Sequence, residues 1–338
     1  MGTERNGSKS TKDKVFDIAV TKNGLFWSFA FLWTMLIALG WTSEEPSKIR
    51  TIIVVFTVFI LAILIIRYAK NKSIITSKKL WIFIFLIKLT LVAIILQYLW
   101  IPAFNPHRAI GTFDPVVFDY YGKLLAESNF NINLIHGVYN YVGQIYYIGA
   151  IYWLFGVSTF YVGIFNALFS LVAFLAITAI LVGCSGNKKG WYFMGLGMLF
   201  PELLYYDAIP GKEVISTCMV ALSILFIYKF LINKSTKYLL FLLLSLGVLT
   251  SVRAVMSIAV VVIGIIWIIV KYRYKLKLIF LYGVIVVFML FLLLPLIIKY
   301  TGGTPNTVGT LLNLSQIAEH GIRITPGEKF IEHYVCYV

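Results

Sequence analysis

The residues best suited to chemistry in this chain are carboxylates that stand beside long apolar runs. Asp114 precedes Pro115, which is favoured in the first turn of a helix, and the sequence up to Glu127 predicts an amphipathic helix. A carboxylate at the mouth of a membrane cavity can accept a proton from a hydroxyl nucleophile, so Asp114 is the candidate catalytic base. The same position suits a helix N-cap, which alone would account for an aspartate there. Asp119 points to another side of this helix, and we expect it to have a supporting role.

A second acidic group lies between two apolar runs, in the sequence from Phe200 to Glu213. It holds Glu202, Asp207 and Glu213, together with Lys212. Ionisable groups near the end of a membrane span are costly and often functional. We therefore expect these acids to have a functional role at the outer end of the span. The alternative interpretation is a surface ion pair such as Glu202 with Lys212.

Three basic residues are candidates for binding a phosphate group. Arg253 lies between two apolar runs, Arg108 follows His107, and Lys212 belongs to the acidic group above. A guanidinium can bind a phosphate through two parallel hydrogen bonds. Snorkelling to lipid headgroups explains Arg253 equally well. Lys88 lies inside an apolar run, where it is expected to pair or to snorkel, and it is assigned no role in the chemistry.

Motifs for metal, nucleotide or activated nucleophile chemistry are absent from the sequence. It contains no HExxH, no pair of CxxC motifs, no P-loop, no GxSxG and no DxD. Cys184, Cys218 and Cys336 have no disulfide or metal spacing, and His136 and His333 are isolated. No cofactor is predicted, and dependence on a divalent metal stays open.

The elements that must position these residues are membrane helices. Of the 338 residues, 60% are hydrophobic and only 13% are charged, where a soluble domain has about 25% charged residues. Apolar runs such as Thr51 to Ala69, whose only charged residue is Arg67 near its end, are long enough to span a bilayer. We predict an all-α, polytopic transmembrane helical bundle. It has about nine spans, at 25–41, 51–69, 80–101, 157–183, 190–206, 213–232, 238–251, 254–270 and 278–299.

The distribution of basic residues predicts the orientation of these spans. Residues 141–156 read YVGQIYYIGAIYWLFG, and their Tyr and Trp content favours a helix lying flat at the membrane interface. With this segment flat and the N-terminus in the cytoplasm, most Lys and Arg fall on the cytoplasmic side, as in membrane proteins generally. The net charge of +15 is then a topology signal with some attraction to anionic lipid, and no nucleic-acid partner is predicted.

The chain therefore divides into three parts. Residues 1–24 form a cytoplasmic segment and 25–299 a transmembrane domain in the cell membrane. Within that domain, 102–156 is a large extracytoplasmic loop with juxtamembrane helices. Residues 300–338 form an extracytoplasmic tail.

The order of these features resembles the GT-C superfamily of membrane glycosyltransferases, especially its protein O-mannosyltransferase and aminoarabinose-transferase types. Asp114, Phe118 and Gly122 fit the family's spacing of an aspartate, an aromatic residue and a small residue in the first large outside loop. Phe155-Gly156 matches the Phe-Gly pair that ends the family's flat helix. A basic turn at 187–190, Pro201 in the next span and the acidic turn 207–213 follow in the family's order. The matching region is roughly 105–235, and two extra spans precede the loop here.

The resemblance implies transfer of a sugar from a polyprenyl-phosphate carrier to a glycan, lipid or protein acceptor on the extracytoplasmic face. Asp114 would be the base, and Arg253, with Arg108 and Lys212, would hold the carrier phosphate. The turn that carries Glu202, Asp207 and Glu213 would help shape the acceptor site. The polyprenyl-phosphate-linked sugar and membrane lipid would be the partners. Two alternatives stay open. A repeat-unit polymerase of the O-antigen type would rely more on outside arginines, and a transporter or flippase for lipid-linked glycans would show paired, broken spans, which the sequence lacks.

Overall fold

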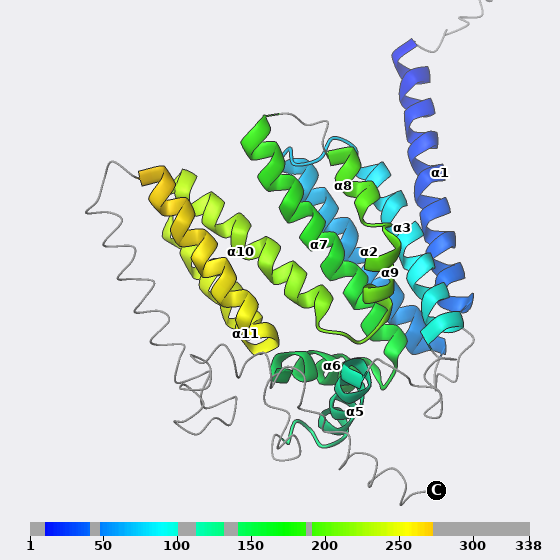
Figure 1. Ribbon diagram of the computed structural model, residues 1–338. Coiled ribbons are helices and arrows are strands. Elements are labelled where there is room, and N and C mark those ends of the chain that lie inside the picture. Colours follow the sequence, from blue (N-terminus) through cyan, green and yellow to red (C-terminus); the bar gives the residue numbers. More distant parts are fainter. Residues whose placement is uncertain (1–10, 41–47, 101–112, 132–140, 187–190, 273–338) are drawn as a thin grey trace, which may run out of the picture.

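A computed structural model describes residues 11–40, 48–100, 113–131, 141–186 and 191–272 of the chain. Every element in these ranges is a helix, and they contain no strand (Figure 1). The predicted all-α class is confirmed for this part of the chain.

Five helices are long and apolar enough to cross a membrane, which confirms the prediction of a multi-pass membrane protein. Four of them cover the predicted spans 51–69, 80–101, 157–183 and 213–232. The five are α2 (Lys48–Asn71), α3 (Lys78–Ile95) with the short π-helix η1 (Leu96–Trp100), α7 (Thr159–Ser185), α10 (Glu213–Asn233) and α11 (Thr236–Tyr272).

The predicted count of about nine spans is not confirmed. The predicted span 25–41 lies in α1 (Thr11–Gly40), whose apolar part, Asn23–Leu39, is short for a crossing. The predicted span 278–299 lies outside the described residues.

The helix α11 turns back on itself at Arg253, whose backbone is non-helical (φ −158°, ψ 83°). The ring of Phe241 lies 5.5 Å from that of Phe226 in α10, and Trp267 lies 5.8 Å from Tyr228 in α10. Along one straight helix, positions 241 and 267 would be about 39 Å apart. Two neighbouring sites on α10 cannot reach both, so α11 is a hairpin of two antiparallel arms with Arg253 at its tip.

The predicted span 190–206 is not one continuous helix. It forms α8 (Trp191–Gly197) and α9 (Pro201–Ala208), which are separated at Met198–Phe200. Pro201 explains the break, because proline has no backbone N–H to donate and disfavours helical geometry in the residue before it. Phe200 accordingly has extended backbone (φ −62°, ψ 130°).

Two further helices, α5 (Phe113–Glu127) and α6 (Val142–Phe155), lie across one end of the bundle (Figure 1). This arrangement agrees with the interpretation of 141–156 as a flat helix. Contacts with α6 place the start of α2 and the tip of α11 at this end, because Arg50 lies beside Gly156 and Ser251 beside Gly143. The start of α10 lies there too, since Lys212 contacts Tyr141, and α7 begins four residues after the end of α6. Basic side chains gather at the opposite end, among them Arg67, Lys70, Lys72, Lys78, Lys79, Lys229, Lys234 and Lys237.

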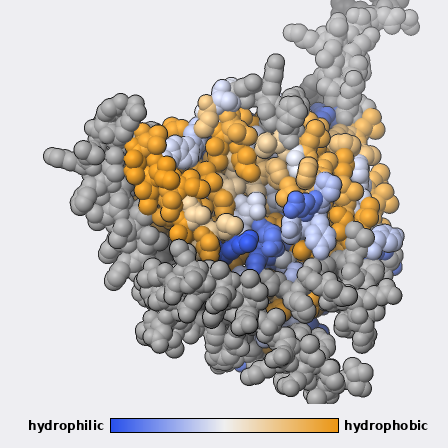
Figure 2. Space-filling view, in the orientation of Figure 1, coloured by the Kyte–Doolittle hydropathy of each residue, from blue (hydrophilic) through white to orange (hydrophobic). Residues whose placement is uncertain are grey.

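The surface of the long helices is largely apolar. Figure 2 shows hydrophobic side chains over much of their outer face, with a hydrophilic patch between them toward the end that carries α5 and α6. Exposed apolar side chains of this extent suit a lipid environment.

Candidate functional site

An irregular segment, residues 209–212, joins α9 to α10 inside the bundle, and all four residues are buried. Non-helical backbone surrounded by apolar groups needs partners for its carbonyl oxygens. Asn166 of α7 donates from Nδ2 to the carbonyls of Asp207 (3.1 Å) and Ile209 (3.0 Å). Gln144 of α6 donates from Nε2 to the carbonyl of Gly211 (3.0 Å). These bonds fix the path of the chain just before Lys212.

A buried ion pair holds α8 and α9 in place across the break between them. Lys88 of α3 pairs with Asp207, and both side chains are fully enclosed. Lys88 also donates from Nζ to the carbonyl of Met198 (2.9 Å), and the hydroxyl of Ser170 donates to Oδ1 of Asp207 (2.5 Å). Lys88 therefore contacts both sides of the break between α8 and α9. Because Asp207 is enclosed, it can support a site only by setting the position of the segment that follows.

Lys212 is held beneath α5 and α6 by aromatic rings. Its side chain is buried, and its Nζ lies 3.7 Å from the ring centre of Tyr141 and 5.8 Å from that of Phe118. The two rings contact each other edge to face, at 5.4 Å. Aromatic faces attract an ammonium group, so the two rings stabilise the side chain of Lys212 in an apolar setting. A cation held in this way can bind an anionic group at the edge of the rings.

The backbone of Asp114 lies in the first turn of α5, one turn before Phe118. Residues four apart lie on the same side of a helix. The backbone of Asp114, the candidate base, therefore lies on the same side of α5 as Phe118, which contacts Lys212. Gly122, another turn on, marks the close approach of α5 to α6, where an added Cβ would lie 2.5 Å from Cγ2 of Ile148. The Asp-aromatic-Gly spacing thus follows one side of α5. The side chain of Asp114 lies outside what the structure describes.

The tip of the α11 hairpin contacts the start of α6. An added Cβ at Gly143 would lie 2.9 Å from the backbone carbonyl carbon of Ser251, so this contact requires a glycine. Arg253, two residues on, is partly buried, and it forms no hydrogen bond or ion pair within the described ranges. Arg253 and Lys212 therefore flank the same end of α6. Arg108 lies outside the described residues.

The two remaining acids of the 200–213 group lie in different places. Glu213 begins α10, and its Oε2 lies 2.5 Å from where a Cβ on Gly211 would stand, so this carboxylate folds back toward Gly211. Glu202 is exposed in the first turn of α9, where a negative charge suits the helix N-terminus. The alternative pair of Glu202 with Lys212 is not formed.

Asp119 lies toward the other end of α6. The hydroxyl of Tyr152, near the end of α6, donates to Oδ1 of Asp119. Burial raises the pKa of the Asp119 carboxyl, while the hydrogen bond from Tyr152 and the charge of Lys123 oppose this rise. This carboxyl is thus placed on a different side of α5 from Phe118.

The structure therefore gathers Lys212, Glu213 and Arg253 around the start of α6. Asp114 lies one turn before Phe118 on the same side of α5. Sequence reasoning missed Gln144, Asn166 and Tyr141. The available signal for the first two was a lone amide inside an apolar run, which is costly unless it is bonded.

Within the described ranges, no three His, Cys, Asp or Glu side chains gather as a metal site. Comparison with family models, with characterised proteins and with solved structures finds no match to this chain.

Proposed function

We propose that this protein transfers a sugar from a polyprenyl-phosphate-linked donor to a hydroxyl-bearing acceptor at the extracytoplasmic membrane surface. The observation that supports it most is the position of Lys212, a buried cation beside Phe118, one turn from Asp114 on α5. A phosphate-binding cation and a candidate base are the two groups that such a transfer needs. The resemblance to GT-C glycosyltransferases in residues 105–235 points the same way.

The chemistry assigns a separate task to each group. Asp114 takes the proton of the acceptor hydroxyl, whose oxygen forms a bond to the anomeric carbon of the sugar. The bond between that carbon and the phosphate oxygen breaks, and its electron pair stays with the carrier phosphate. Lys212 and Arg253, with Arg108 as a further candidate, stabilise the charge that develops on the phosphate. Glu213 orients the acceptor.

The proposal includes an orientation. The N-terminus lies in the cytoplasm, and the layer of α5 and α6 lies outside, together with the C-terminus. The gathering of basic residues at the end of the bundle away from α5 and α6 supports this orientation. About nine spans in total fit it, with 278–299 as the last.

The test is sugar transfer from a labelled polyprenyl-phosphate donor by the purified full chain. Asp114→Asn should lower turnover by about 10² to 10⁴-fold, the usual contribution of a general base, and leave carrier binding unchanged. Asp119→Asn is the matched control on the same helix and should cost much less. If Asp114 serves only to stabilise the first turn of α5, both Asn variants keep ordinary activity, and Asp114→Ala only loses about 1 kcal/mol of stability.

Two alternatives each rest on a specific observation. Arg253 at the hairpin tip also suits a polymerase of lipid-linked repeat units, for which Arg253→Lys should abolish activity while Asp114→Asn does not. The break between α8 and α9, with the buried ion pair of Lys88 and Asp207 beside it, also suits a transporter of lipid-linked glycans. A transporter would move the labelled lipid across vesicles without forming a product.

A further inference from the structure

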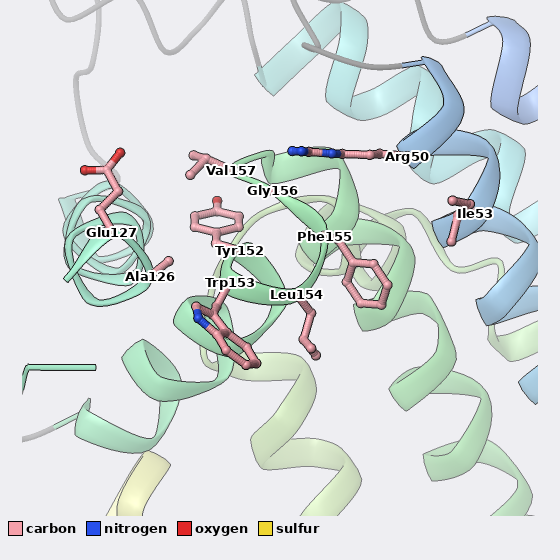
Figure 3. Close-up of a pocket in the computed structure, with 10 residues that line it drawn as sticks. All are labelled: Arg50, Ile53, Ala126, Glu127, Tyr152, Trp153, Leu154, Phe155, Gly156 and Val157. Carbon is pink, nitrogen blue, oxygen red and sulfur yellow. The ribbon is translucent and has the colours of Figure 1, made fainter. Parts of the chain in front are cut away.

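A groove opens at the C-terminal end of α6, away from Lys212 (Figure 3). It has a volume of about 530 Å³, and it lies between the start of α2, the end of α5 and the chain from Tyr152 to Val157. Tyr152 is about 16 Å along α6 from Tyr141, which covers Lys212. The groove is therefore separate from the proposed transfer site.

Opposite charges stand on the two sides of the groove. Figure 3 shows Arg50 of α2 on one side and Glu127 of α5 on the other, with Tyr152 between them. The guanidinium of Arg50 lies over Gly156, whose φ is +101°, and an added Cβ there would lie 2.9 Å from Nη1 of Arg50. A glycine is thus required at 156 both for its backbone conformation and for the position of Arg50.

The rim of the groove is apolar and open. Ile53, Trp153 and Leu154 are each more than half exposed, at 52%, 56% and 62%. Tryptophan is enriched where a membrane meets water, because its ring is apolar and its N–H is polar. The groove thus joins two opposite charges to a surface that suits hydrocarbon.

The carboxylate of Glu127 is available to a ligand. Glu127 lies near Lys123 in the same helix, at 3.9 Å, but more than half of each side chain is exposed. Exposed ion pairs of this kind contribute little and are easily replaced. A ligand ammonium placed in the groove can therefore compete with Lys123 for the carboxylate of Glu127.

We propose that this groove binds the headgroup of an aminoethyl phospholipid, such as phosphatidylethanolamine. Arg50 binds the phosphate, the carboxylate of Glu127 accepts hydrogen bonds from the primary ammonium, and an acyl chain lies against Ile53 and Leu154. Phosphatidylglycerol meets only the requirement of Arg50. Phosphatidylcholine has no N–H with which to bond Glu127.

Trp153 provides the readout, because it lies on the rim. The full chain is reconstituted in phosphatidylcholine vesicles, and brominated phosphatidylethanolamine, phosphatidylglycerol or phosphatidylcholine is titrated in as a fluorescence quencher. The difference between the wild type and Trp153→Phe isolates the quenching of Trp153 from that of the other tryptophans. Brominated phosphatidylethanolamine should quench Trp153 at a clearly lower mole fraction than the other two lipids.

Variants then separate the two charges. Arg50→Ala should raise the half-quenching mole fraction of phosphatidylethanolamine about five-fold, the size expected for one basic residue near a charged surface. Glu127→Gln should make phosphatidylethanolamine no better than phosphatidylcholine while leaving phosphatidylglycerol unchanged. Lys48→Ala is the matched control, because Lys48 lies two residues from Arg50, is exposed and does not line the groove.

Three results would overturn the proposal: equal quenching by all three lipids in the wild type, a preference that survives Arg50→Ala, or a preference for phosphatidylglycerol. Helix content by circular dichroism checks that each variant is folded. Should Arg50→Ala fail to fold, Arg50→Lys replaces it, and an intermediate loss of the preference supports the proposal while no loss contradicts it.

Discussion

Lys88 and Asp207 form an ion pair that joins the middle of α3 to the end of α9 and is closed to solvent on all sides. An isolated charge in such surroundings would cost several kcal/mol, so each residue requires the other. The pair also lies at one end of a series of polar contacts that runs through Asn166 to the irregular segment 209–212.

Removing one partner of this pair should be far worse than removing both. Lys88→Met leaves the carboxylate of Asp207 buried and unpaired, and we expect a loss of about 3 to 5 kcal/mol. The double variant Lys88→Met with Asp207→Leu should recover much of that loss. Asp207→Leu alone completes the double-mutant cycle, and denaturant titrations of all four proteins in detergent give the coupling free energy. Losses of stability that simply add in the double variant would contradict a direct pair.

Gly122 should tolerate no side chain. An added Cβ would lie 2.5 Å from Cγ2 of Ile148 and 3.3 Å from the backbone nitrogen of Gly149, so Gly122→Ala must push α5 away from α6. We expect a loss of about 1 to 3 kcal/mol. Under the proposed function it also lowers sugar transfer, because α5 carries Asp114.

The matched control for this variant is Gly247→Ala, where nothing lies within 4 Å of an added Cβ. That change should leave stability unchanged or raise it by up to about 1 kcal/mol, because alanine favours a helix. Equal effects of the two variants on stability and transfer would show that the crossing of α5 and α6 is not tight.

Asp119 should make stability depend on pH in the acid range. Burial raises its pKa above the ordinary 3.8, so the folded protein binds more protons than the unfolded chain between 3.8 and the raised pKa. Stability should therefore fall as pH rises through that window. Asp119→Asn removes the titrating group and should flatten this part of the curve. Melting temperatures from pH 3.5 to 7 would measure this pH dependence. A wild-type melting temperature that rises with pH in this window, with the same slope in Asp119→Asn, would exclude Asp119 as its cause.

The proposed orientation predicts which positions are open to reagents outside the cell. In a background with Cys184 and Cys336 replaced by Ser, a cysteine at position 129 should react with an impermeant maleimide in intact cells. Cysteines at 72, 188 and 234 should react only after permeabilisation. Reaction at 188 from outside would contradict the orientation and the flat position of α6 together.

The strongest spans could be predicted from the sequence because their signal is local. Apolar runs such as 51–69 and 157–183 are long and hold at most one charged residue, and no folded context is needed to recognise them. Arg253 also marked the turn between two apolar runs, which the structure shows as the hairpin tip. The break in 190–206 was missed because that stretch is apolar throughout, and a single proline does not by itself decide between a kink and two helices.

The candidate site was only partly predictable, for a different reason. Lys88 was expected to pair or to snorkel, but its partner Asp207 is distant in sequence, and only tertiary packing brings the two together. For the same reason Asp207 was placed on an acceptor surface with Glu202 and Glu213, whereas the three acids lie in separate surroundings. Lys212 was identified by its type, but its aromatic contacts with Tyr141 and Phe118 could not be read from spacing.

The irregular segment 209–212 also bears on how the chain assembles in the membrane. The side chains that bond the carbonyls of residues 198–211 are Lys88, Gln144 and Asn166, and all three precede that stretch in the chain. A ribosome therefore delivers the three donors before it delivers the irregular backbone that depends on them. Residues 198–211 can enter the bilayer with the partners for these carbonyls already in place. A circular permutant that moved residues 198–212 ahead of α3 would reverse this order and should insert poorly, even though its finished contacts would be the same.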